Sequence, residues 1–155
     1  MRFLKKLFLL LLVLFLMAQF FGPEQNKGDI TTVQPFLEET NPPAEVKAIL
    51  KESCFDCHSN ATRYPWYGKI TPVDYWMADH IKHGKEHFNV STWSEANLKK
   101  KDHKMEELIE MVEEKEMPLP SYTWTHTESK LSDEQIASMV AWAKNVRAMY
   151  AQQMK

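Results

Sequence analysis

Glycine and cysteine are both scarce in this chain, and their scarcity excludes several classes of protein. Only four of the 155 residues are glycine, at positions 22, 28, 68 and 84. No two have the spacing of a phosphate-binding P-loop and no three fit G-x-G-x-x-G, so nucleotide binding by either motif is excluded. The two cysteines are too few for a framework of several disulfides or for a four-thiolate cluster. A formal charge of −2 provides no basic surface for nucleic acid.

Histidine, methionine and tryptophan are well represented, with six, nine and five residues respectively. Imidazole and thioether groups ligate transition metals, and tryptophan lines apolar cavities. The length is sufficient for one domain. The composition therefore points to a single domain that holds a metal or a cofactor.

Residues 1–22 have the pattern of a membrane-directed segment. Arg2, Lys5 and Lys6 form a positive start, and residues 7–18 are apolar without a break. As a helix, residues 7–21 would cover about 22 Å, less than the roughly 30 Å of a hydrocarbon core, and lysine side chains that reach the headgroups make up part of the difference. An uncleaved anchor and a signal peptide both fit, although no A-x-A-like cleavage site is present. Both interpretations predict that the rest of the chain is exported.

The remainder of the chain divides into a tether and a helical domain. Residues 23–40 lack a clear hydrophobic period and include Gly28 and Pro35, so we expect a tether there. From 41 to 155 the signals are helical, and no sustained apolar–polar alternation predicts a strand. Helices are predicted to start at Asn41-Pro42, to run from Thr71-Pro72 to about Gly84, to cover residues 102–115, and to start at a Ser132–Gln135 capping box. The segments 60–70 and 118–131 are predicted to be long ordered loops. The fold class expected for 41–155 is all-α.

The motif that carries chemistry is Cys54-Phe55-Asp56-Cys57-His58, which is the C-x-x-C-H attachment sequence of c-type haem. Two thiols on one turn can each add to one vinyl group of haem, and the histidine that follows is then directed at the iron. A thioredoxin-like redox pair would need a βαβ context, a disulfide in so short a loop would add little stability, and a zinc site lacks a second ligand pair at the usual spacing. We therefore expect one covalently attached haem c, held by Cys54, Cys57 and His58.

The second axial ligand of the iron is less specified by the sequence. Met117 precedes a proline and lies late in the chain, as the methionine ligand does in small c-type cytochromes, so it is the preferred candidate. His80, His87 and His126 are the alternatives. His80 and His83 share a helix face, whereas Gly84 is expected to end the helix before His87.

A metal-ligating histidine usually donates its other ring N–H to a carbonyl or carboxylate group. For His58 we expect that acceptor to come from the loop at Tyr64-Pro65-Trp66.

With these residues in place, the chain resembles the bacterial haem-binding domain family of small envelope proteins with one C-x-x-C-H motif. The resemblance covers about residues 41–144. It rests on these residues: Asn41-Pro42-Pro43, Cys54 to Asn60, Thr62 to Tyr67, Trp76, His80-Ile81, Gly84, His87-Phe88-Asn89, Ser91, Trp93, Met117-Pro118-Leu119, Tyr122, His126 and Leu131-Ser132. It implies covalent haem and a cytochrome-c-like helical fold, and it leaves the second axial ligand open. Relatives of the family can accompany di-haem peroxidase domains.

These observations lead us to expect a membrane-tethered periplasmic one-electron carrier. The protein would lie at the bacterial inner membrane with its domain facing the periplasm, or be free in the periplasm if the N-terminal segment is cleaved. Redox proteins of the cell envelope would be its partners, and no bond-making step on a substrate is required. Two alternatives remain, a haem peroxidase and a haem-based sensor, each with an exchangeable ligand at the second axial position.

Overall fold

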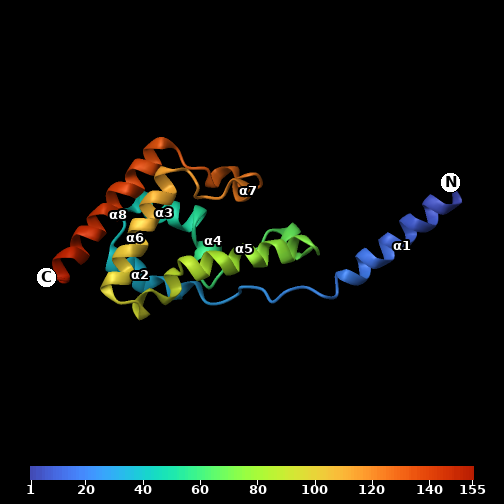
Figure 1. Cartoon of the computed structure of the whole chain (residues 1–155), viewed down its shortest axis with the longest axis horizontal. Helices are drawn as coiled ribbons and strands as arrows, with labels where there is room; N and C mark the ends of the chain where they lie inside the picture. The colour runs from blue at the N-terminus through green and yellow to red at the C-terminus, as the bar shows by residue number, and fades with distance from the viewer.

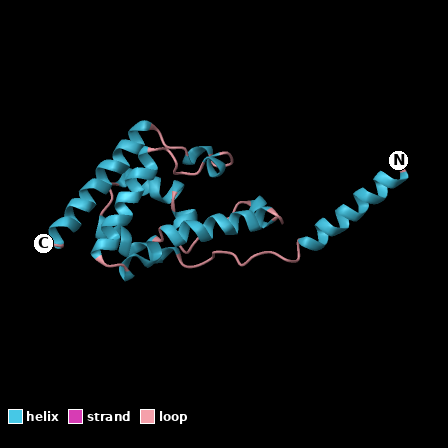
Figure 2. Cartoon of the chain, in the orientation of Figure 1, coloured by secondary structure: helices cyan, strands magenta, loops and turns pink.

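The computed structural model describes all 155 residues, and it is helical throughout (Figures 1 and 2). A single isolated β-bridge pairs Lys27 with Ala61. The α-helices are α1 (Arg2–Ala18), α2 (Gln34–Thr40), α3 (Ala44–Ser53), α4 (Phe55–His58), α5 (Val73–His87), α6 (Leu98–Glu113), α7 (Pro120–Thr123) and α8 (Asp133–Gln153). Four short 3₁₀ helices separate them: η1 (Ile30–Val33), η2 (Trp66–Lys69), η3 (Val90–Glu95) and η4 (Thr127–Ser129). The predicted all-α class is confirmed.

The long helices α6 and α8 pack side by side and form the largest helix contact in the fold (Figure 1). Their facing residues, such as Met105 and Ile109 on α6 and Met139 on α8, belong to one buried core. Helix α8 starts at the predicted capping box, in which the Ser132 hydroxyl accepts from the backbone of Gln135 and the Gln135 side chain accepts from the backbone of Ser132. This pair satisfies two of the N–H groups that an uncapped helix start leaves free.

The predicted tether over residues 23–40 is wrong for its second half. Residues Ile30–Val33 form η1 and Gln34–Thr40 form α2, and Val33, Phe36 and Leu37 are buried in the core. The ring of Phe36 packs edge-on against Trp93 at a centroid distance of 5.0 Å and against Trp142 at 6.1 Å. Pro35 does not interrupt this helix because it occupies the first turn, where a missing backbone N–H costs nothing.

Two predicted helix boundaries also differ from the structure. Asn41 is the C-cap of α2, in the left-handed conformation with φ 40°, and α3 begins only at Ala44. Asparagine is tolerated in this conformation better than other side chains are, which suits it to end a helix. Gly84 does not end α5, which continues through His87.

The first helix extends away from the domain, at the opposite end of the molecule from the C-terminus of α8 (Figure 1). No helix in the structure has both the length and the apolar character that crossing a bilayer requires. The predicted membrane helix at residues 1–22 is therefore without support. The segment after α1 is bonded to the domain, because the Gln19 side chain donates to the Thr71 carbonyl at 3.1 Å and accepts from the Thr71 amide at 3.0 Å.

Candidate haem-binding site

The C-x-x-C-H motif lies at a sharp corner between α3 and α4. Cys54 ends α3 and starts α4, and its carbonyl accepts from the amides of Cys57 at 3.2 Å and His58 at 2.9 Å. These bonds place both thiols and the imidazole on a single turn. Neither cysteine forms a disulfide. Burial, reinforced by the neighbouring Cys57, raises the pKa of Cys54 to about 12, and burial with the Asp56 charge raises the pKa of Cys57 to about 11. Both thiols are therefore protonated at neutral pH.

The imidazole of His58 is held by the C-terminal end of α5. Its Nδ1 lies 2.8 Å from the Phe88 carbonyl and 3.0 Å from the Gly84 carbonyl. Carbonyl oxygens can only accept, so Nδ1 carries the proton and Nε2 is the nitrogen left for a metal. Burial lowers the pKa of His58, a shift that the two hydrogen bonds oppose in part. The prediction of a carbonyl acceptor is confirmed, but its predicted source at Tyr64–Trp66 is wrong.

Gly84 allows α5 to approach the attachment turn closely. A Cβ atom at this position would lie 2.9 Å from the Cys57 carbonyl oxygen and 3.2 Å from the Cys57 Cβ. Because a contact below 3.0 Å to a backbone atom forces a shift, glycine is required by the packing rather than by backbone conformation. The Gly84 carbonyl can reach His58 only because this contact is so close.

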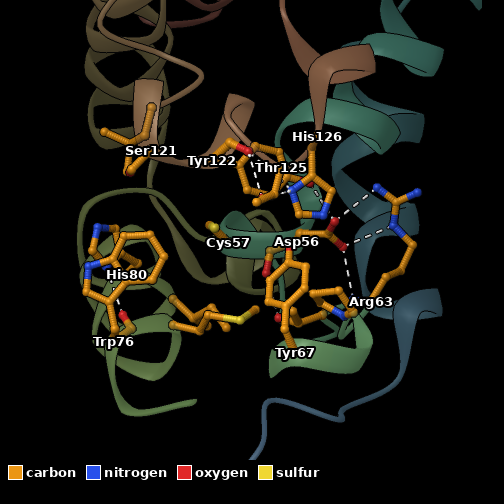
Figure 3. A pocket seen from close by; sticks show the side chains of 15 residues that line it. Asp56, Cys57, Arg63, Tyr67, Trp76, His80, Ser121, Tyr122, Thr125 and His126 are labelled. Carbon is orange, nitrogen blue, oxygen red and sulfur yellow. Dashed lines mark hydrogen bonds and ion pairs between the residues drawn. The ribbon is translucent and has the colours of Figure 1, made fainter. Parts of the chain in front are cut away.

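A cavity opens beside Cys57, between the attachment turn, α5 and the segment that contains α7. The empty space there totals about 530 Å³, a figure that includes space open to solvent. Figure 3 shows that the cavity has two facing walls with Cys57 and Asp56 between them. One wall includes Tyr122, Thr125 and His126, and the other includes Tyr67, Trp76 and His80.

The candidate axial ligands are distributed unevenly around this cavity. His80 and His126 line it, whereas His58, His87 and Met117 do not. Met117 lies just before the lining residue Leu119, and its amide donates to the Met111 carbonyl at 3.0 Å.

The two lining histidines are both held through Nδ1. The Nδ1 of His80 lies 2.8 Å from the Trp76 carbonyl, and that of His126 lies 3.2 Å from the Tyr122 carbonyl. In each ring, Nε2 is the nitrogen left for other partners. His83 has its Nδ1 bonded to the Asp79 carbonyl at 2.9 Å and is exposed.

Sequence reasoning missed an ionic network inside the attachment motif. The Asp56 carboxylate is buried and accepts from the Arg63 amide at 3.0 Å, from Arg63 Nε at 3.1 Å and from the Tyr122 hydroxyl at 2.8 Å. Hydrogen bonds to Asp56 raise the pKa of Arg63, and burial raises that of Tyr122. The sequence feature that could have predicted this network is the charged residue between the two cysteines of the haem motif, because a buried carboxylate needs a partner.

One polar atom on the cavity wall lacks a partner. The hydroxyl of Tyr67 is buried without any hydrogen bond, although its side chain lines the cavity. An unpaired buried hydroxyl is costly, and a bound group that accepts a hydrogen bond would remove the cost.

Two comparisons with known proteins give a match. The model of a family described as the haem-binding domain matches residues 13–145. The chain belongs to the haem-binding domain family. It is also 34% identical over 110 residues to the cytochrome c peroxidase Ccp of Escherichia coli (strain K12), a match that covers 68% of this chain and 24% of that protein. The chain thus spans about a quarter of that relative's length. No solved structure matches it.

The residues of the site fit the haem that the family binds. Two thiols not paired in a disulfide stand on one turn, and a neutral imidazole keeps Nε2 for a metal. Of the three attachment residues, Cys57 lines the adjoining cavity, and Cys54 and His58 lie behind it. The unpaired Tyr67 hydroxyl would be available to donate a hydrogen bond to a bound cofactor.

Proposed function

We propose that this protein binds one haem c covalently through Cys54 and Cys57, with His58 as an axial ligand, and that it carries single electrons. The observation that supports this most directly is the arrangement of the attachment turn. Two protonated thiols are followed at once by an imidazole whose Nδ1 is fixed by the Gly84 and Phe88 carbonyls. Orienting the ring through a carbonyl also makes the ligating nitrogen a better donor.

The haem supplies a reversible one-electron couple when it is bound, and the chain determines its surroundings. Cys54 and Cys57 tie the cofactor to the α3–α4 corner. The indole of Trp76 and the side chain of Ile81 give the cavity apolar walls that limit water. Exclusion of water lowers the local dielectric, which is one of the properties that set a haem potential.

For the second axial position we propose Met117, as the sequence predicts, with His80, His87 and His126 as the alternatives. Thioether ligation raises the potential relative to a second imidazole, which suits a carrier in an oxidising compartment. We further propose that the domain works outside the cytoplasmic membrane, because haem attachment to bacterial c-type proteins takes place there. Its partners would then be redox proteins of the cell envelope.

A second candidate function is favoured by the similarity to a cytochrome c peroxidase. His80 and His126 line the cavity and have Nε2 available, so either imidazole could transfer a proton to or from a bound peroxide. This activity would need an open or exchangeable axial position, which is where it differs from a carrier.

The test uses the full chain produced with haem-attachment machinery. Haem should remain on the protein through acid–acetone extraction, and it should be lost when Cys54 and Cys57 are both changed to Ala. Low-temperature magnetic circular dichroism then separates methionine, histidine and open coordination. Met117→Ala should abolish the sulfur-to-iron charge-transfer band and lower the potential, and Met154→Ala, an exposed methionine at the end of α8, is the control. Complete extraction of haem from the unmodified protein would refute covalent attachment. Rapid peroxide turnover with high-spin iron would favour the peroxidase.

A further inference from the structure

Residues 118–131, here called the wall segment, form one side of the cavity and pack against the rest of the protein mainly at their C-terminal end, where η4 contacts α3 and Leu131 lies against the core. The segment contains only the four-residue helix α7 and the three-residue turn η4, and the main packing partner of α7 is η4 itself. Trp124, which follows α7, is 78% exposed and therefore does not hold the segment against the core. The position of the part around α7 therefore depends largely on a small number of specific bonds.

Two hydroxyl groups connect the wall segment to the α3–α4 corner. The Tyr122 hydroxyl donates to Asp56 Oδ2 at 2.8 Å and lies 3.4 Å from the Glu52 carbonyl. The hydroxyl of Ser129, which is completely buried, donates to the same Glu52 carbonyl at 3.0 Å. Asp56 lies inside the haem motif and Glu52 lies two residues before it, so the wall is attached to the motif and to the end of α3.

Asp56 is a rigid acceptor rather than a mobile surface carboxylate. Its side chain is 9% exposed and is fixed by Arg63, whose Nε and Nη2 atoms lie 3.1 and 3.0 Å from the two carboxylate oxygens. Arg63 in turn donates to the Glu52 side chain at 3.0 Å and to the Lys51 carbonyl at 3.1 Å. The guanidinium is half-exposed, but its Nε and Nη2 atoms both donate to Asp56 and so hold that carboxylate in place. Hydrogen bonds to such a charged acceptor are stronger than those between neutral groups.

Tyr122 also orients the histidine of the wall. Its ring stacks on His126 with a centroid distance of 4.3 Å and an angle of 11° between the planes. Its carbonyl lies 3.2 Å from His126 Nδ1. Figure 3 shows both rings on the same side of the cavity, with the Asp56–Arg63 pair beside them. A change at the Tyr122 hydroxyl therefore alters the placement of His126 and of the whole wall.

We infer that Tyr122 is a positioning residue of the haem site, whose bond to Asp56 keeps the wall segment closed and so restricts the access of small ligands to the cavity. The inference rests on the proposed function, because it takes haem to occupy this cavity. Asp56, between the two cysteines, is then the acceptor that couples the attachment turn to the opposite side of the site. Tyr122 acts through Asp56 and His126 and takes part in no bond-making step.

The test compares Tyr122→Phe with the unmodified holoprotein. The change removes one hydroxyl and keeps the ring, so stacking on His126 is preserved. Imidazole binding to the ferric protein, which must displace the proposed Met117 thioether, should become about tenfold faster, since a hydrogen bond to a charged group is lost. Amide hydrogen exchange in residues 118–131 should accelerate by a similar factor. Tyr75→Phe is the control, because the Tyr75 hydroxyl also donates to a protein oxygen, the Phe21 carbonyl at 3.0 Å, but lies outside the cavity lining.

Unchanged ligand kinetics and unchanged exchange in Tyr122→Phe would overturn the inference, as would equal effects in both tyrosine variants. If Tyr122→Phe loses its fold, Ser129→Ala removes the other anchor of the wall segment and should give the same acceleration in smaller measure. If the unmodified chain takes up no haem, the proposed function fails separately. Hydrogen exchange of the haem-free chain then still decides whether Tyr122 holds the wall, because that experiment requires no cofactor.

Discussion

Replacing Gly84 with alanine tests whether the contact between α5 and the attachment turn is as tight as the structure indicates. The added Cβ would lie 2.9 Å from the Cys57 carbonyl oxygen and 3.3 Å from the Cys57 carbonyl carbon. Neither atom can move easily, because the turn is fixed by the bonds from the Cys57 and His58 amides to the Cys54 carbonyl. Helix α5 must therefore shift away from α4.

Three contributions decide the sign of the effect on stability. Alanine favours a helix interior over glycine by about 1 kcal/mol. Overpacking against a backbone costs about 1–3 kcal/mol. A shift of α5 also lengthens the 3.0 Å contact between His58 Nδ1 and the Gly84 carbonyl, and a weakened hydrogen bond costs about 0.5–1.5 kcal/mol. We expect Gly84→Ala to lower the free energy of unfolding by roughly 1–3 kcal/mol.

Urea unfolding of the haem-free chain measures this change, with Lys82→Ala as the control on the same helix. The Lys82 side chain is 72% exposed and pairs only weakly with Glu86 at 4.0 Å, so its removal should change stability by less than about 0.5 kcal/mol. In the holoprotein, Gly84→Ala should also shift the potential, because His58 loses part of its orientation. A variant about 1 kcal/mol more stable than the unmodified protein would refute the reasoning, since helix propensity alone would then account for the result.

Two further predictions concern the haem-free chain. The pKa of Cys57 rises from 9.0 to about 11, so the folded chain keeps a proton that the unfolded chain releases above pH 9. The free energy of unfolding should therefore fall between pH 9 and 11, by up to about 1.4 kcal/mol per pH unit for each buried thiol. Urea titrations at several pH values should show a shallower fall when Cys54 and Cys57 are both Ala. Equal pH dependence of stability in the variant and the unmodified chain would contradict this. Tyr67→Phe should stabilise the haem-free chain by about 1 kcal/mol, because its buried hydroxyl has no partner. Tyr150→Phe should destabilise the chain, because the Tyr150 hydroxyl donates to Glu39 at 2.7 Å. A loss of stability in both variants would contradict the conclusion that the Tyr67 hydroxyl is unpaired.

The parts of the fold that sequence predicts are those with local signals. The start of α8 is specified by Ser132 and Gln135 within four residues, and the prediction is confirmed by the capping box. Helix α2 escaped prediction because its seven residues are too few to show a period and include Pro35 in the first turn. Asn41 was assigned to the wrong helix because asparagine serves both to start a helix and to end one, and only the backbone angle distinguishes the two roles.

The same distinction between local and distant signals applies to the site. The C-x-x-C-H motif is contained in five residues, and its haem is supported by the family to which the chain belongs. The carbonyl groups that hold His58 come from Gly84 and Phe88, 26 and 30 residues away, and no pattern near the motif indicates them. The bond from Tyr122 to Asp56 spans 66 residues and depends on how the chain returns after α6.

The contacts made by residues before and within α2 limit where a processing enzyme could cut the chain without destabilising the fold. The Asn26 side chain donates to the Ser59 carbonyl and to the Thr62 hydroxyl, both at 2.9 Å, and so supports the loop that follows the haem motif. Phe36 is completely buried among the aromatic rings of the core. A cut before Asn26 would leave both in place, whereas a cut between them would weaken that loop and one beyond Phe36 would open a large void in the core. A processed form of the protein must therefore keep nearly everything that follows the first helix.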